Sequence, residues 1–336
     1  MSQQRRVVEG QIHFLTRRCT QRRFFLRPSK MVNQVVRYAL AVAAPRHGIR
    51  IHAVLININH VHIGLTDVRG TLPDFERDFD QLVARALNCH YGRGEAFWGP
   101  DSYDNFEVHD PVTLVQKLVY LFVNAVKDGQ VARPEDWPGL FTSPEDMGTT
   151  TIVAHKPEAA FFGGRRPDDW EPTYPPARRA HRAYRKRHPL PPRDQPRRQR
   201  KRSTLPDSAE LEITVPHLFR DKSIEEVHQL LRSALEEHLE EIYAERRREG
   251  RGPFRGPHGV RQVDPLDGPG DTFPTFKRNP RIACLITDLR IRLLAELKAW
   301  REAYRVALEA WRAGDHQIVF PPGTYAMRVV HGARVA

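Results

Sequence analysis

One segment, residues 50–65, constrains the fold of this chain most. It predicts two adjoining β-strands, because apolar residues dominate both halves and a polar turn, Asn57–Asn59, separates them. The second strand begins with His60 and His62, which flank one apolar residue. Successive side chains of a strand point to opposite faces, so both imidazoles project to the same face. In that arrangement the two rings lie close enough to share a metal ion.

The other patterns in the first 150 residues predict helices and strands that alternate along the chain. Apolar residues recur there at the spacing of two for strands and of three to four for helices. The order β-α-β-β-α-β-α predicts an α+β fold, an antiparallel sheet with helices on one face. The elements besides segment 50–65 are a strand at Gln11–Arg17, a helix after Ser29, a helix at Asp74–His90, a strand at Phe97–Val108 and a helix from Pro111, with Gly129 just past its end.

The chain divides into three regions by composition. Residues 1–150 form the mixed domain, and residues 151–204 form a basic linker that is rich in proline and arginine. The pattern of apolar residues in 205–336 predicts a mostly helical C-terminal region, whose role is unknown. Its expected elements are a strand at Glu210–Val215, a helix with a capping box at Ser223 and Glu226, a helix at Asp288–Ala313, and a short strand or hairpin at Ile318–Val330.

The net charge of +12 is concentrated in the linker. Between residues 178 and 202 lie twelve Lys or Arg residues and one Asp, a local balance of +11. A basic tract of this density favours nucleic acid as a partner, because phosphate attraction needs no defined fold. A solvated linker without a fixed partner is the alternative. The tract supplies the candidate DNA contacts Arg185, Lys186, Arg187, Arg197 and Arg198.

Several function classes are disfavoured by the composition. The sequence has no run of about 18 uncharged apolar residues, so it does not predict a membrane span. The first residues lack the apolar core of a signal peptide. Three cysteines stand far apart without a CxxC partner, which is typical of reduced thiols and of neither a disulfide framework nor a zinc site. We therefore expect a cytoplasmic protein.

Tyr120 and Asn124 are candidate site residues in addition to the two histidines. They stand four apart on a predicted helix and therefore share one face. An amide oxygen beside two imidazoles suits Mg²⁺ or Mn²⁺. A phenol can attack a phosphate that a metal polarises. The alternatives, taken residue by residue, are a core position for Tyr120 and a backbone-bonding helix end for Asn124.

Three motifs in order resemble the single-tyrosine HUH transposases, and within them the REP-associated tyrosine transposases. Residues 12–17, Ile-His-Phe-Leu-Thr-Arg, with Arg22, Arg23 and Phe25 after them, resemble the family's first strand. Residues 59–63, Asn-His-Val-His-Ile, match the central signature. Tyr120 and Asn124 match the motif of the family's nucleophile helix. The residues that follow in the motif are matched by Val126, Gly129, Glu135, Trp137 and Pro138. The resemblance covers about the first 140 residues.

The resemblance implies a ferredoxin-like fold and a set of roles. His60 and His62 correspond to the family's metal ligands, Asn124 to its third ligand and Tyr120 to its nucleophile. The implied reaction cuts single-stranded or hairpin DNA through a 5′-phosphotyrosine and rejoins strands, with Mg²⁺ or Mn²⁺ as cofactor. The chain departs from the pattern at Ile58 and at Ala125, where the family often has proline; without that proline the nucleophile helix can run on.

The sequence leaves several alternatives open. A DNA-binding protein that has lost cleavage would share the fold and the basic tract. A histidine-triad hydrolase would need a third histidine at Gly64, which argues against that class. Arg17, Arg22 and Arg23 are candidate phosphate contacts, with ordinary surface arginine as the alternative. Related enzymes act as homodimers or alone, and the implied location is the bacterial nucleoid.

Overall fold

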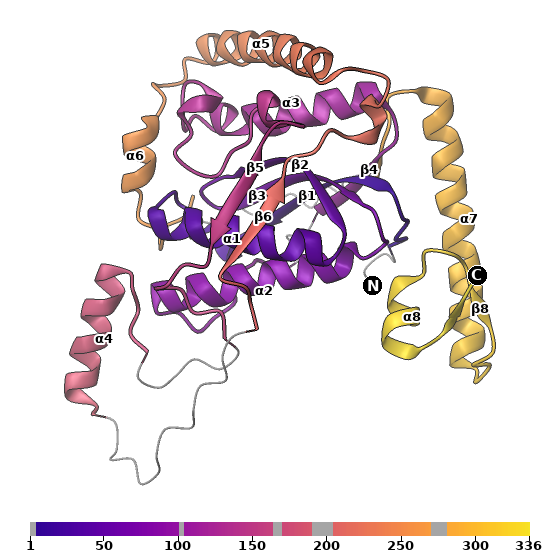
Figure 1. The fold of residues 1–336 in the computed structure, drawn as a ribbon, viewed down its shortest axis with the longest axis horizontal. Coiled ribbons are helices and arrows are strands. Elements are labelled where there is room, and N and C mark those ends of the chain that lie inside the picture. Colours follow the sequence, from indigo (N-terminus) through magenta and orange to yellow (C-terminus); the bar gives the residue numbers. More distant parts are fainter. Residues whose placement is uncertain (1–4, 101–103, 164–169, 190–203, 270–280) are drawn as a thin grey trace.

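A five-stranded sheet with the strand order β2-β3-β1-β4-β7 forms the centre of the protein (Figure 1). The computed structural model describes residues 5–100, 104–163, 170–189, 204–269 and 281–336. The first four strands in the list are mutually antiparallel, and β7 adds to the edge in parallel with β4. The strands are β1 (Gln11–Arg18), β2 (Ile49–Ile56), β3 (His60–Asp67), β4 (Asp104–Val108) and β7 (Ile282–Ala283).

The α+β class is confirmed, and the four antiparallel strands have the order of a ferredoxin-like sheet. Helices α1 (Lys30–Arg46) and α2 (Leu72–Tyr91) cover one face, as expected (Figure 1). The expectation that all helices share that face is wrong for α3 (Pro111–Lys127), which packs on the opposite face beneath α5 (Ile224–Arg248). The sheet is therefore covered on both faces.

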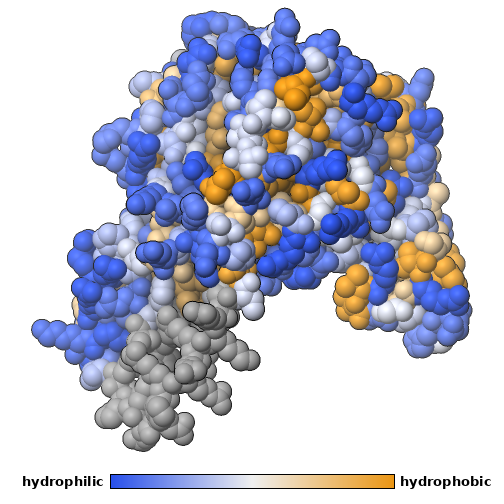
Figure 2. Space-filling view, viewed as in Figure 1, coloured by the Kyte–Doolittle hydropathy of each residue, from blue (hydrophilic) through white to orange (hydrophobic). Residues whose placement is uncertain are grey.

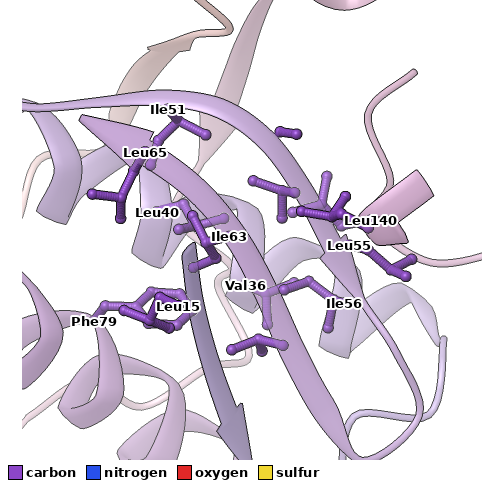
Figure 3. Packing of buried hydrophobic residues seen from close by; sticks show 14 of the residues in the cluster. Leu15, Val36, Leu40, Ile51, Leu55, Ile56, Ile63, Leu65, Phe79 and Leu140 are labelled. Carbon is purple, nitrogen blue, oxygen red and sulfur yellow. The ribbon is translucent and has the colours of Figure 1, made fainter. Parts of the chain in front are cut away.

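Strand β3 shows how alternation builds these two layers. Val61, Ile63 and Leu65 are fully buried on the face of α1 and α2. Figure 3 shows the last two beside Val36 and Leu40 of α1. Gly64 points the other way, where an added Cβ would lie 3.3 Å from the ring of Phe14 and 3.7 Å from the Leu118 side chain. The missing side chain lets α3 approach this strand closely.

Helix α3 begins and ends at residues that suit its termini. The carboxylate of Asp110 accepts a hydrogen bond from the Thr113 backbone N–H at 2.8 Å, and Pro111 occupies the first turn. Gly129 follows the helix with a φ of +70°, a left-handed conformation that glycine adopts without strain. The predicted start and end of this helix are therefore confirmed.

The main core extends beyond the first 150 residues. Strands β5 (Thr151–His155) and β6 (Ser208–Glu212) form an antiparallel ribbon that packs on α1. The predicted capping box of Ser223 and Glu226 starts α5, and α6 (Gly256–Gln262) follows. Buried residues from β1 to α6 belong to one hydrophobic cluster. The domain boundaries at residues 150 and 204 stay a prediction.

The last part of the chain has a second, smaller core. Helix α7 (Thr287–Arg312) packs there with α8 (Tyr325–His331) and two short strands, β8 (Val319–Phe320) and β9 (Arg334–Val335). Of the expected short strand or hairpin at 318–330, the short strand is present as β8, whereas the hairpin is not: β8 and β9 are parallel, and α8 connects them. A parallel pair needs such a crossover.

Helix α4 (Pro175–Arg187) lies inside the predicted linker. It buries none of its residues, and Figure 2 shows it as hydrophilic at the lower left of the molecule. It carries Arg185, Lys186 and Arg187 in its last turn, where cations suit the helix dipole. Within the ranges that the structure describes, we find no helix with both the length and the apolar character that a bilayer crossing requires.

Replacing Leu118 with alanine should lower the free energy of unfolding by about 2–5 kcal/mol, because the fully buried side chain joins α3 to the sheet. Urea unfolding followed by circular dichroism measures the change. Val112→Ala on the same helix is the control, since Val112 is 56% exposed and its removal should matter by less than about 0.5 kcal/mol. Equal losses would contradict this packing.

Candidate active site

The two histidines of β3 present their Nε2 atoms to one cavity. Their ring centroids lie 4.6 Å apart, at right angles. The Nδ1 of His60 lies 2.7 Å from the Oδ1 of Asn59, and the Nδ1 of His62 lies 2.9 Å from the Oγ1 of Thr16. An amide oxygen only accepts, so the Nδ1 of His60 donates and its Nε2 keeps a lone pair. Partners of this kind orient metal-binding imidazoles.

Both imidazoles are neutral at pH 7. Burial lowers the pKa of His60, and the positive charges of Arg18 and Arg22 lower it further, whereas Asp128 and the Asn124 side chain raise it. Burial lowers the pKa of His62 well below its ordinary value, and the neighbouring His60 adds to this effect. A neutral imidazole is the form that binds a metal ion.

Helix α3 places Tyr120 and Asn124 over this pair. The Oδ1 of Asn124 lies 3.1 Å from the Nε2 of His60. The ring of Tyr120 lies 6.0 Å from the ring of His62, edge to face. The absence of proline at Ala125 lets α3 run on to Lys127, and Asn124 still faces the histidines. The four residues therefore meet at one place, although 60 positions separate His60 from Tyr120 in the sequence.

Two residues that the sequence analysis missed support Asn124. The buried Asn57 donates from Nδ2 to the Oδ1 of Asn124 and to the Oδ2 of Asp128, both at 2.9 Å. Asp128 lines the same cavity. Its spacing could have revealed it, because positions 120, 124 and 128 share one helix face. Asn57 had no such signal beyond its place in the polar turn.

The donor set fits a divalent cation. The Nε2 of His62 is buried and has no hydrogen-bond partner within the described residues. The Nε2 of His60 and the Oδ1 of Asn124 both present lone pairs, since that oxygen already accepts from Asn57. Adjacent ligands of an octahedral ion lie roughly 3 Å apart when each bond is about 2.1 Å. The 3.1 Å separation of these two atoms matches that spacing.

The third atom of this donor set is an amide oxygen. Among the described residues, no group of three His, Cys, Asp or Glu side chains could hold a metal ion. Asn124 supplies an oxygen in the place where a carboxylate would otherwise be required. Imidazole nitrogens suit transition-metal ions, and an amide oxygen suits Mg²⁺ or Mn²⁺, so Mn²⁺ meets both preferences of this donor set.

Tyr120 is held at the rim of a cavity of about 460 Å³, with 41% of its surface exposed. Burial and the charge of Asp128 raise the pKa of its phenol, against smaller lowering effects of Asn124 and Arg18. The phenol is therefore protonated before a substrate binds. The ammonium group of Lys127 lies 5.1 Å from the ring centroid. Arg18 and Lys117 also line the cavity and are groups that can bind phosphate oxygens, while Asp104 and Asp128 are the acidic residues of its walls.

Strand β1 separates two neighbouring arginines. Arg18 lies opposite His60 in the sheet register, and Arg17 lies opposite Val61. Arg18 therefore shares the face of the histidines, whereas Arg17 points to α2 and pairs with Asp80 at 3.2 Å. The structure thus places the candidate contact Arg17 away from the cavity. The sequence alone does not distinguish Arg18 from Arg17, since the choice between them requires the register of β1 with β3.

The other candidate DNA contacts lie at varying distance from the histidines. Arg22 borders the site, because its backbone oxygen accepts from the Nδ2 of Asn59 at 3.1 Å. Arg23 donates instead to the backbone oxygen of Leu266. Figure 1 places α4, which carries the basic residues at 185–187, well away from α3. Arg197 and Arg198 lie outside the described residues.

The C-terminal region contacts both ends of α3. At its start, the backbone N–H of Leu285 donates to the Oγ1 of Thr113 at 2.9 Å and to the Oδ2 of Asp110 at 3.2 Å. Beyond its end, the backbone N–H of Arg255 donates to the oxygen of Gly129 at 3.1 Å. Ala283 of β7 lines the cavity itself. The region without a predicted role therefore holds the helix that carries Tyr120.

No family model matches this chain, and no curated protein matches it. Among solved structures, a REP-associated tyrosine transposase bound to a REP hairpin is 21% identical with a TM-score of 0.33, and the match covers 41% of this chain and 81% of that one. A predicted transposase from Deinococcus radiodurans R1 is 22% identical with a TM-score of 0.27, over 34% of this chain and 92% of its own. With similarities this low, the function has to be inferred from the residues of the site.

Proposed function

We propose that this protein is a metal-dependent endonuclease and strand transferase that acts on single-stranded or hairpin DNA. Tyr120 is the nucleophile, and His60, His62 and Asn124 hold Mg²⁺ or Mn²⁺. The observation that carries the proposal is the meeting of three atoms able to bind a metal ion with a tyrosine in one cavity. The resemblance of the three sequence motifs to tyrosine transposases supports DNA as the substrate.

The proposed reaction transfers a phosphate group of the DNA from the 3′ oxygen of one nucleotide to the Tyr120 oxygen. The Tyr120 oxygen attacks the phosphorus in line with the 3′ oxygen, which leaves as the new bond forms. The phenol loses its proton, and the departing oxygen gains one. The products are a 5′-phosphotyrosine and a free 3′-hydroxyl, and another 3′-hydroxyl can reverse the step and join two strands.

The chain itself supplies orientation and positive charge. A bound Mg²⁺ or Mn²⁺ would polarise the phosphate as a Lewis acid. Arg18 and Lys117, which line the cavity, stabilise the charge on the phosphate oxygens. Asn57 fixes the amide of Asn124 so that its oxygen faces His60. All these residues come from one chain, so the reaction does not require a second copy, and a homodimer stays a prediction.

Replacing Tyr120 with phenylalanine should abolish the covalent protein–DNA adduct and leave DNA binding intact, because only the attacking oxygen is lost. Labelled hairpin DNA with single-stranded flanks, incubated with Mn²⁺ and separated on a denaturing gel, reveals the adduct. Tyr184→Phe is the matched control, since Tyr184 is an exposed tyrosine on α4. An adduct that persists in Tyr120→Phe would refute the assignment, and DNA binding without any adduct in the native protein would favour a protein that has lost cleavage.

The two arginines of β1 should differ in their effect on cleavage. Arg18→Ala should slow adduct formation by about tenfold to a hundredfold, because a positive group beside the phosphate is lost. Arg17→Ala should leave the rate of the folded protein unchanged and lower the free energy of unfolding by about 1–3 kcal/mol, because Asp80 loses its partner. Single-turnover kinetics and urea unfolding measure both effects. Similar rate losses in the two variants would contradict the register of β1 with β3.

A further inference from the structure

A second cavity of about 430 Å³ lies at the opposite end of β3 from the histidines. Its walls come from four parts of the chain: residues 6–9, the turn that contains Arg69 and Gly70, Trp300 of α7, and the segment around α8 and β9. Two contacts fasten these parts together. The backbone N–H of Val7 donates to the oxygen of Gly323 at 3.0 Å, and the Tyr325 hydroxyl donates to a carboxylate oxygen of Asp74.

The walls of this cavity carry more positive than negative charge. Arg6, Arg69 and Arg328 line it, and Glu9 is the one acidic side chain among the described residues of its lining. Arg6 pairs with Glu107 at 3.6 Å. Arg69 and Arg328 form no ion pair with any side chain that the structure describes. Two guanidinium groups are therefore available to an anion.

A small cavity of about 30 Å³ shares Arg6 with the larger one and extends the positive charge. Arg5, Arg281 and Arg301 line it, with Glu107 as the acidic member. Burial lowers the pKa of Arg281, and the charge of Arg5 lowers it further. The Nε of Arg6 is buried and donates to no acceptor within the described ranges. Crowded arginines with an unused donor favour a bound anion.

This arginine-lined cavity is separate from the proposed active site. Seven residue steps along β3 separate His60 from Asp67, and Arg69 lies two residues further. At about 3.3 Å a step, the two sites are more than roughly 20 Å apart. A ligand that reaches both sites must therefore be long, as a nucleic acid strand is.

We propose that the cavity between residues 6–9, Arg69 and Arg328 binds a phosphate of the same DNA whose scissile phosphate lies at Tyr120. This inference rests on the proposed function, since it assigns a second contact to the same substrate. Planar guanidinium groups bind phosphate oxygens in pairs, which favours Arg69 and Arg328 as the contacts. The walls between them include Tyr325, whose ring lies 5.9 Å from the Arg328 guanidinium carbon.

The double variant Arg69→Ala/Arg328→Ala tests the proposal. Fluorescence anisotropy with a labelled hairpin DNA, in EDTA to prevent cleavage, gives the dissociation constant between 50 and 200 mM salt. We expect binding to weaken by about tenfold at the lower salt concentration and the slope of log K against log salt to fall in magnitude by about one, because one phosphate contact worth near 0.9 is lost. The double variant Arg37→Ala/Arg85→Ala removes the same charge from exposed positions outside the cavity and should change both values less.

Equal effects of the two double variants would overturn the proposal. Glu9→Gln is a second variant in the opposite direction, because loss of the acidic wall should strengthen binding; unchanged binding in this variant would also count against the cavity. The proposed function is tested separately by the adduct. Arg69→Ala/Arg328→Ala should still form it at saturating DNA, and its absence in the native protein would refute the function without deciding whether the cavity binds a phosphate.

Discussion

The packing of α3 against β3 beside Gly64 is the contact on which the site depends. Gly64 leaves room for the Leu118 side chain, and Leu118 is fully buried there. Tyr120 and Asn124 follow within two turns and reach the histidines that precede Gly64 on the strand. A Cβ at position 64 would press against the ring of Phe14 at 3.3 Å and would be in contact with the Leu118 side chain at 3.7 Å. The small residue at position 64 thus suits the close packing of Leu118 on the strand, and the two halves of the site lie beside this contact.

The C-terminal region adds a second constraint on the same helix. Its backbone N–H groups bond both the start and the residue beyond the end of α3, and α5 packs along its outer side. Such contacts limit the movement of Tyr120 relative to the histidines. The site itself combines neutral imidazoles and a protonated phenol with two cations, Arg18 and Lys117, and two carboxylates, Asp104 and Asp128.

Local periodicity accounts for what the sequence predicted well. On a strand, a spacing of two residues puts His60 and His62 on one face. On a helix, a spacing of four residues puts Tyr120 and Asn124 on one face. The order of elements indicated the α+β class. The side of the sheet that α3 covers could not be predicted, because an amphipathic helix pattern does not say which face it meets.

Residues whose role depends on distant pairing were missed. Arg17 and Arg18 are neighbouring arginines, and nothing in the sequence shows which of them faces the histidines. Only the register of β1 with β3 places Arg18 at the cavity. Leu285 bonds the start of α3 through its backbone, which leaves no trace in residue type. The parallel pairing of β8 with β9 could not be predicted either. Each strand has only two residues, which is too few to show an alternation of apolar and polar residues.

Anomalous X-ray diffraction from crystals soaked in Mn²⁺ shows whether the histidines of β3 and the amide of α3 form one metal site. We expect one strong peak about 2.0–2.3 Å from the Nε2 of His60, the Nε2 of His62 and the Oδ1 of Asn124. A cation bound elsewhere, or a cavity that stays without a peak at saturating Mn²⁺, would contradict the account.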